Sequence, residues 1–77
     1  MRDSSVDFLD LRGVECPLNF VKAKLCLEKM KSGHILELFL DQGEAVETVP
    51  NGLSEEGHKV KSIDKISNYY RILVVKN

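Results

Sequence analysis

Cys16 is the residue of this sequence best suited to nucleophilic chemistry. It stands directly before Pro17, at the end of the stretch Leu11-Arg12-Gly13-Val14-Glu15. A residue before proline is held out of the helical conformation, whereas proline itself suits the first position of a helix. We therefore expect Cys16 to be the N-cap of a helix that begins at Pro17.

A cysteine at a helix N-terminus meets free backbone N–H groups and the positive end of the helix dipole. Both stabilise the thiolate, which is the form of cysteine that attacks other sulfur atoms. Arg12 would add positive charge near Cys16, and Glu15 would oppose it. A small, buried and unreactive cysteine is the alternative at this point, because a Cys-Pro helix start is only a moderately specific signal.

The second cysteine and the two histidines predict no further chemical site. Cys26 would lie about 15 Å along the same helix from Cys16, whereas a disulfide needs Cα atoms within about 7 Å. Cys26 also shares the apolar stripe of that helix, so we expect it to pack in the core. His34 and His58 lack companions at metal-ligand spacing, and we predict no metal site and no cofactor. For His58, which follows Gly57 after a helix, we expect a structural capping role.

Hydrophobic spacing predicts the elements that position Cys16. We expect strands over residues 6–11, 35–40, 58–63 and 69–75, with a turn at 67–68. Helices are expected from Pro17 to a stop at residues 32–33, with Phe20, Ala23, Cys26, Leu27 and Met30 on its core stripe, and over residues 44–56. Pro50 should kink the second helix or divide it into two pieces.

This order predicts an α/β two-layer sandwich with the arrangement β-α-β-α-β-β, formed by residues 1–77 as a single domain. Two right-handed crossovers place both helices on one face of a four-stranded mixed sheet. The apolar last strand should lie in the middle. Loops that follow parallel strands gather at one edge, where open sheets bind ligands. Asp41 and Glu44 should therefore lie beside Cys16 and could contact a partner, with ordinary solvated turn residues as the alternative.

Composition and charge indicate which classes of partner and which cellular location to expect. Eleven basic and twelve acidic residues among 77 leave a net charge of -1, which disfavours direct nucleic-acid binding. No stretch approaches the ~20 apolar residues of a membrane span. Residues 1–5 precede no apolar run, so we expect no signal peptide and a cytoplasmic location, where cysteines stay reduced.

The stretch Leu9-Asp10-Leu11-Arg12-Gly13-Val14-Glu15-Cys16-Pro17 resembles the signature of the TusA (SirA-like) sulfur-carrier family. The similarity continues through Lys24, Leu27, Gly33, Asp41, Val49-Pro50 and Gly57-His58 and covers nearly the whole chain. The resemblance implies a two-layer fold like that of the C-terminal domain of translation initiation factor three. It also implies that Cys16 accepts sulfur as a persulfide from a cysteine desulfurase and passes it to an acceptor protein. The pathways of the family include tRNA thiolation, cofactor synthesis and sulfur metabolism.

One residue departs from the family pattern. Asn19 stands where the family usually has a second proline, giving Cys16-Pro17-Leu18-Asn19. Proline there would stiffen the first helical turn, whereas asparagine adds an amide N–H and a side chain that could reach the cysteine sulfur. Arg12, Gly13, Pro17 and Asn19 are thus predicted to support the Cys16 site, while the identities of donor and acceptor are not implied.

Three alternatives stay open. The chain could be a non-catalytic interaction or RNA-binding module of the same fold, or a thiol redox regulator, which the lack of a nearby resolving cysteine weakens. The third is a carrier of selenium, which would need the same nucleophile as a carrier of sulfur.

The open face of the sheet gives a separate prediction. Ile35 and Phe39 should point away from the helices, with Glu37 between them. This open face predicts a weak homodimer or a docked partner.

Overall fold

The computed structural model describes residues 6–77, so the expectation for residues 1–5 lies outside the described residues. Strands and helices follow one another in the predicted β-α-β-α-β-β order. Their bounds are β1 (Val6–Asp10), α1 (Leu18–Glu28), β2 (Ile35–Asp41), α2 (Ala45–Glu55), β3 (Lys59–Lys65) and β4 (Tyr69–Val75). The predicted last strand is found without change.

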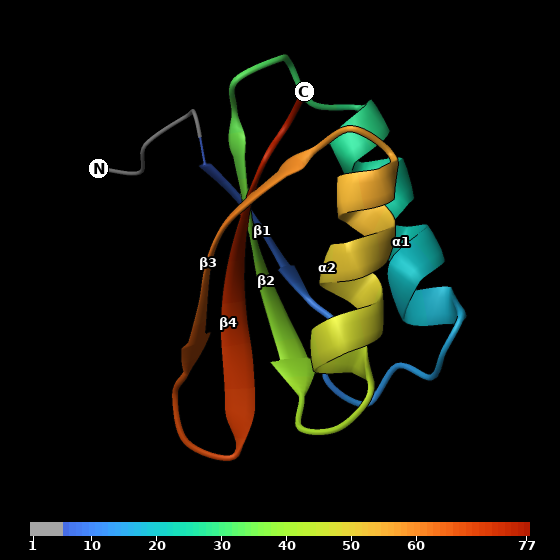
Figure 1. The fold of residues 1–77 in the computed structure, drawn as a ribbon, viewed down its shortest axis with the longest axis vertical. Helices are drawn as coiled ribbons and strands as arrows, with labels where there is room; N and C mark the ends of the chain where they lie inside the picture. Colours follow the sequence, from blue (N-terminus) through green and yellow to red (C-terminus); the bar gives the residue numbers. More distant parts are fainter. Residues whose placement is uncertain (1–5) are drawn as a thin grey trace.

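The sheet is mixed and has the order β1-β2-β4-β3. β1 and β2 are parallel, while β4 pairs antiparallel with both β2 and β3. Figure 1 shows α1 and α2 together on one side of this sheet, which leaves the other side open. The two-layer arrangement and the central place of the last strand are thus confirmed.

The core lies between the sheet and the helices, and it follows from the alternation of side chains along β2. Leu36, Leu38 and Leu40 are fully buried, as are Ile72 and Val74 on β4. The helices contribute Ala23, Leu27, Val49 and Leu53, which are also fully buried. Burial of each large aliphatic side chain favours folding by about 1.5–3 kcal/mol. Ile35, Glu37 and Phe39 alternate with these leucines and lie on the open face, as predicted.

The first helix begins later and ends earlier than the sequence predicted. Pro17 is the cap residue, with φ -92° and ψ 7°, and α1 starts at Leu18. Cys16 therefore lies one residue before the cap and is not the N-cap itself. At the other end, the N–H of Lys29 donates to the carbonyl of Cys26 at 3.2 Å. This tighter, three-residue bonding ends the helix at Glu28, before the glycine that was expected to stop it.

The second helix is continuous over eleven residues, although Pro50 lies inside it. The sequence predicted either a kink or a division into two pieces, and the division is wrong. Pro50 removes a single N–H donor, and its side chain is buried among the core contacts of the helix. The helix ends in a Schellman motif, in which Gly57 has a φ of +99° and its N–H donates to Ser54. The N–H of His58 donates to the carbonyl of Leu53 at 3.1 Å, so this residue has the capping role expected of it.

Candidate functional site

The loop between β1 and α1 is held against the end of β2. The N–H of Leu11 donates to the carbonyl of Phe39 at 2.9 Å, and the Leu11 side chain is almost fully buried. Gly13 has a φ of +81°, a conformation that suits glycine, and its N–H donates to the carboxylate of Asp41. The loops after the two parallel strands therefore meet at one edge of the sheet, as the topology predicted.

Cys16 lies in a turn at this edge, and its thiol is exposed. The turn is closed by a hydrogen bond from the N–H of Asn19 to the carbonyl of Glu15, at 3.0 Å. The Cys16–Pro17 peptide bond is cis. In the described part of the chain no pocket is found. Because the thiol is exposed, another protein can reach it.

Asn19 supports this turn with its backbone N–H and with its buried side chain. The sequence predicted the added N–H, but not the contact of the side chain with Phe20. The additional amide N–H provided by asparagine is the donor that closes the turn on Glu15. The side chain is buried, with 2% of its surface exposed, and its Oδ1 accepts a hydrogen bond from the N–H of Phe20 at 2.7 Å. The side-chain oxygen therefore forms its hydrogen bond within the first turn of α1.

Arg12 directs its guanidinium to the open face of the sheet. Nε and Nη2 donate to the two carboxylate oxygens of Asp10 at 2.9 and 2.8 Å. These bonds lower the pKa of Asp10 to about 2. The guanidinium also lies over the rings of Phe39 and Tyr69. Asp10 was not predicted as a partner of Arg12, although two residues spaced by two at the end of a strand share one face.

Asp41 and Glu44 lie at the same edge as Cys16, and both are exposed. Asp41 has a structural contact, because its carboxylate accepts the N–H of Gly13. Glu44 is the cap residue of α2, and its carbonyl accepts the N–H of Thr48 at 2.8 Å. Their contact with a partner stays a prediction.

Cys26 occupies a different environment from Cys16. It is a free thiol, half-buried against the core. Burial raises the pKa of the Cys26 thiol, and the charge of Asp7 adds to this, whereas Lys29 acts in the opposite direction. The thiolate is consequently disfavoured at Cys26, as the packing role predicted from the sequence requires.

An exposed apolar stripe on α1, formed by Leu18, Val21 and Leu25, was not noticed in the sequence. These side chains are 53%, 39% and 51% exposed. Their spacing of three and four residues places them on the helix face opposite the buried Ala23 and Leu27. That spacing is the signal that could have revealed them. The stripe begins two residues after Cys16 and continues along the helix.

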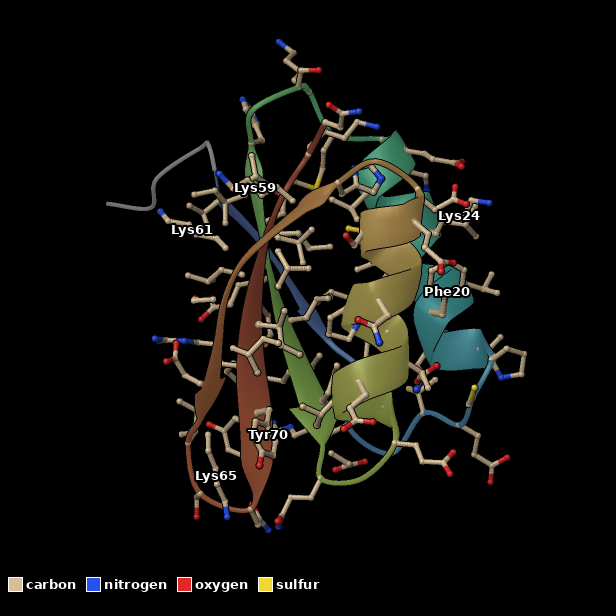
Figure 2. The ribbon with its side chains drawn as sticks, in the orientation of Figure 1. Phe20, Lys24, Lys59, Lys61, Lys65 and Tyr70 are labelled. Carbon is tan, nitrogen blue, oxygen red and sulfur yellow. The ribbon has the colours of Figure 1, made fainter. Side chains whose placement is uncertain are left out.

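Lysine side chains lie on both layers of the molecule. Lys59, Lys61 and Lys65 lie along β3, the edge strand, while Lys24 lies on α1, as Figure 2 shows. Lysines on an edge strand discourage pairing with another strand. Lys24 Nζ lies 3.4 Å from Glu56 Oε1, and this ion pair joins α1 to the C-cap residue of α2.

Within residues 6–77, no three side chains of histidine, cysteine, aspartate or glutamate are grouped so that they could hold a metal ion. No helix of the described chain is long and apolar enough to cross a membrane.

Comparison with known proteins gives a consistent result. The model of the family described as sulfurtransferase TusA matches residues 7–76. A candidate sulfur carrier protein from Archaeoglobus fulgidus is 41% identical over 70 residues, which are 91% of this chain and 80% of the relative. A candidate sulfur carrier protein from Thermotoga maritima is 38% identical over 58 residues, or 75% of this chain and 73% of the relative.

A solved structure shares the fold. The crystal structure of a SirA-like protein from Desulfitobacterium hafniense superimposes with a TM-score of 0.75 at 18% sequence identity. The match covers 91% of this chain and 95% of that protein. At this identity the likeness concerns the fold alone, and it supports the two-layer arrangement described above.

Proposed function

The chain belongs to the TusA sulfurtransferase family, and from this membership and the site geometry we propose that it is a sulfur carrier that holds a persulfide on Cys16. The observation that carries the proposal is the exposed Cys16 thiol at the sheet edge where the two loops after the parallel strands meet. A carrier must meet two other proteins in turn, and an open site suits such exchange.

The reaction needs no external oxidant. The Cys16 thiolate attacks the terminal sulfur of a persulfide on the donor, so one S–S bond forms at Cys16 and the donor's S–S bond breaks. The donor cysteine leaves as a thiolate and takes up the proton that the Cys16 thiol released, and Cys16 becomes a persulfide. Discharge repeats the same exchange toward an acceptor nucleophile. Sulfane sulfur moves from chain to chain while the number of electrons is conserved.

The donor we propose is a cysteine desulfurase or a similar persulfide-bearing protein, and the acceptor is a downstream protein of a reducing, cytosolic pathway. Docking of the donor on α1 would bring its persulfide to Cys16. The exposed stripe of Leu18, Val21 and Leu25 supplies apolar contact area for this docking, and Lys22 beside it suits an acidic rim on the donor.

Sulfur loading tests the proposal. The protein is incubated with a cysteine desulfurase and cysteine, separated from the desulfurase, and measured by intact-mass spectrometry. We expect the added mass of sulfur on the wild type and on Cys26→Ala, and none on Cys16→Ser. Addition of a thiol acceptor should then remove the adduct. Wild-type loading of Cys16→Ser would overturn the proposal, and a redox regulator would instead show disulfide-linked species without the sulfur adduct.

A further inference from the structure

Arg12, in the loop before Cys16, contacts side chains of three strands on the open face of the sheet. Its side chain forms a forked pair with Asp10 at the end of β1, and its backbone N–H donates to the same carboxylate at 3.1 Å. Its Cζ lies 5.1 Å from the ring centroid of Phe39 on β2 and 4.6 Å from that of Tyr69 on β4. We refer to this group of four residues as the Arg12 clamp.

The clamp has a defined geometry. A forked arginine–carboxylate pair fixes the plane of the guanidinium, and both rings lie within the distance of about 6 Å at which cation–π attraction acts. Phe39 is itself held in a row, because its ring centroid lies 4.7 Å from that of Phe8 and 4.8 Å from that of Tyr69. The guanidinium therefore rests on side chains that constrain one another.

The backbone of the next residue is anchored as well, since the N–H of Gly13 donates to the carboxylate of Asp41. Consecutive residues, Arg12 and Gly13, are thus attached to the sheet. Only Val14 and Glu15 separate these anchors from Cys16, and the turn closed by Asn19 follows immediately. A displacement at Arg12 has few bonds over which it can be absorbed before it reaches the sulfur.

We propose that Arg12 is a positioning residue for sulfur transfer: its clamp on Asp10, Phe39 and Tyr69 fixes the loop that presents Cys16 to the incoming persulfide. The inference rests on the proposed function. Arg12 touches no reacting atom, and its charge is paired with Asp10. Attack on a sulfur atom requires alignment of the nucleophile with the breaking bond, and a displacement of about 1 Å can lower such a rate by up to ~100-fold.

Substitutions distinguish this role from an effect of positive charge on Cys16. Arg12→Lys keeps the charge but cannot form the planar fork, whereas Arg12→Gln removes both. If the clamp acts by position, both variants should slow the transfer. Arg71→Gln is the matched control, because Arg71 is a second arginine of the open face whose ion pairs, with Glu37 and Asp64, do not involve the loop.

The experiment measures sulfur loading from a cysteine desulfurase by rapid quench at increasing desulfurase concentration. We expect the rate at saturating donor to fall about 10-fold or more in Arg12→Lys and Arg12→Gln, with little change in the half-saturating concentration. Hydrogen exchange at the Gly13 amide should become faster in both, while the core amides of Leu38 and Ile72 keep wild-type protection. Arg71→Gln should load at the wild-type rate.

The outcomes separate the two proposals. Wild-type loading rates and Gly13 protection in both Arg12 variants would overturn the clamp, and a wild-type rate in Arg12→Lys alone would replace it with a charge effect. If the wild type itself takes up no sulfur, the proposed function fails, and the clamp is judged by alkylation of Cys16 with iodoacetamide. An alkylation rate altered in the Arg12 variants but not in Arg71→Gln would support the clamp, and equal rates in all four proteins would reject it.

Discussion

At the scale of single residues, the two cysteines show how position relative to one helix separates an exposed thiol from a half-buried one. Cys16 precedes α1 and is exposed, while Cys26 lies within α1 and is half-buried. Burial raises the pKa of Cys26, so less of it is thiolate at neutral pH. We expect limiting iodoacetamide to modify Cys16 well before Cys26, as followed by peptide mapping. Faster modification of Cys26 would contradict this environment.

His58 predicts a pH dependence of stability. The side chain is 8% exposed, and its Nδ1 accepts a hydrogen bond from the N–H of Asn77 at 3.2 Å. Burial lowers the pKa of His58 below its ordinary value of 6.5, and Lys76 acts in the same direction, whereas Glu56 and Glu28 oppose it. The folded protein therefore favours the neutral ring, which alone can accept this bond.

The sign of the effect follows from linkage. The stabilisation by neutral His58 is complete above the unfolded pKa of about 6.5 and is lost as the pH falls through that value toward the lower folded pKa. The free energy of unfolding, from urea titrations at several pH values, should thus decrease on acidification below neutrality. His58→Gln keeps an acceptor that does not titrate, and its profile should be flatter. Identical slopes for the two proteins would exclude His58 as the source.

At the scale of elements, side-chain alternation and turn residues predicted most of the fold. Leu36, Leu38 and Leu40 identified β2 and its buried face, because a period of two is readable in the sequence without tertiary information. The ends of α1 were not predictable in this way. Its start depends on the backbone angles of Pro17, and its end depends on how the chain tightens at Lys29. Both are local geometries that residue types alone leave undecided.

Phe20 on α1 packs against Gly52 on α2. This contact predicts whether Gly52→Ala raises or lowers the free energy of unfolding. A Cβ at Gly52 would lie 2.6 Å from Cε1 of Phe20, so alanine requires the ring to move. We expect Gly52→Ala to lower the free energy of unfolding by about 1 kcal/mol or more in the wild type. In the Phe20→Ala background the same change should stabilise by up to about 1 kcal/mol, through helix propensity. Equal signs in the two backgrounds, measured by urea denaturation, would show that the ring is not the obstacle.

The exposed stripe on α1 predicts a docking effect. Leu25→Glu introduces a charge where the proposed donor contact is apolar. We therefore expect a higher half-saturating concentration of the desulfurase and little change in the loading rate at saturation. Ile63→Glu is the control, because Ile63 is similarly exposed, at 46% against 51% for Leu25, but lies on β3. Equal effects of the two substitutions would mean that the stripe has no special part in docking.

At the scale of the whole molecule, topology predicted which loops meet, but not what each side chain contacts there. The edge that contains Cys16 and Asp41 followed from two parallel strands. The direction of Arg12 did not, because a long side chain at a strand end can turn to either face, and its choice depends on Asp10 and on the aromatic rings brought beside it by β2 and β4. Such contacts between distant segments are decided only by the assembled sheet.

The open face also limits self-association. Arg71 Nε lies 3.9 Å from Glu37 Oε2, and Arg71 Nη2 lies 3.6 Å from Asp64 Oδ2, so charged groups occupy the middle of this face. Their removal from water opposes a dry contact. We expect sedimentation equilibrium to show only weak, concentration-dependent dimerisation. Phe8→Lys on this face should abolish it, and Leu25→Lys on α1, on the helical side of the sheet, should not. A tight dimer that is insensitive to Phe8→Lys would place the interface elsewhere.

The central claim is that the transferable sulfur resides on Cys16, and peptide-level mass spectrometry of the wild-type protein tests it most directly. The protein is loaded with a cysteine desulfurase and cysteine, blocked with an alkylating reagent and digested. We predict an additional sulfur atom between Cys16 Sγ and the blocking group, and simple alkylation of Cys26. An additional sulfur on Cys26, or none on Cys16 while the desulfurase turns over, would contradict the account.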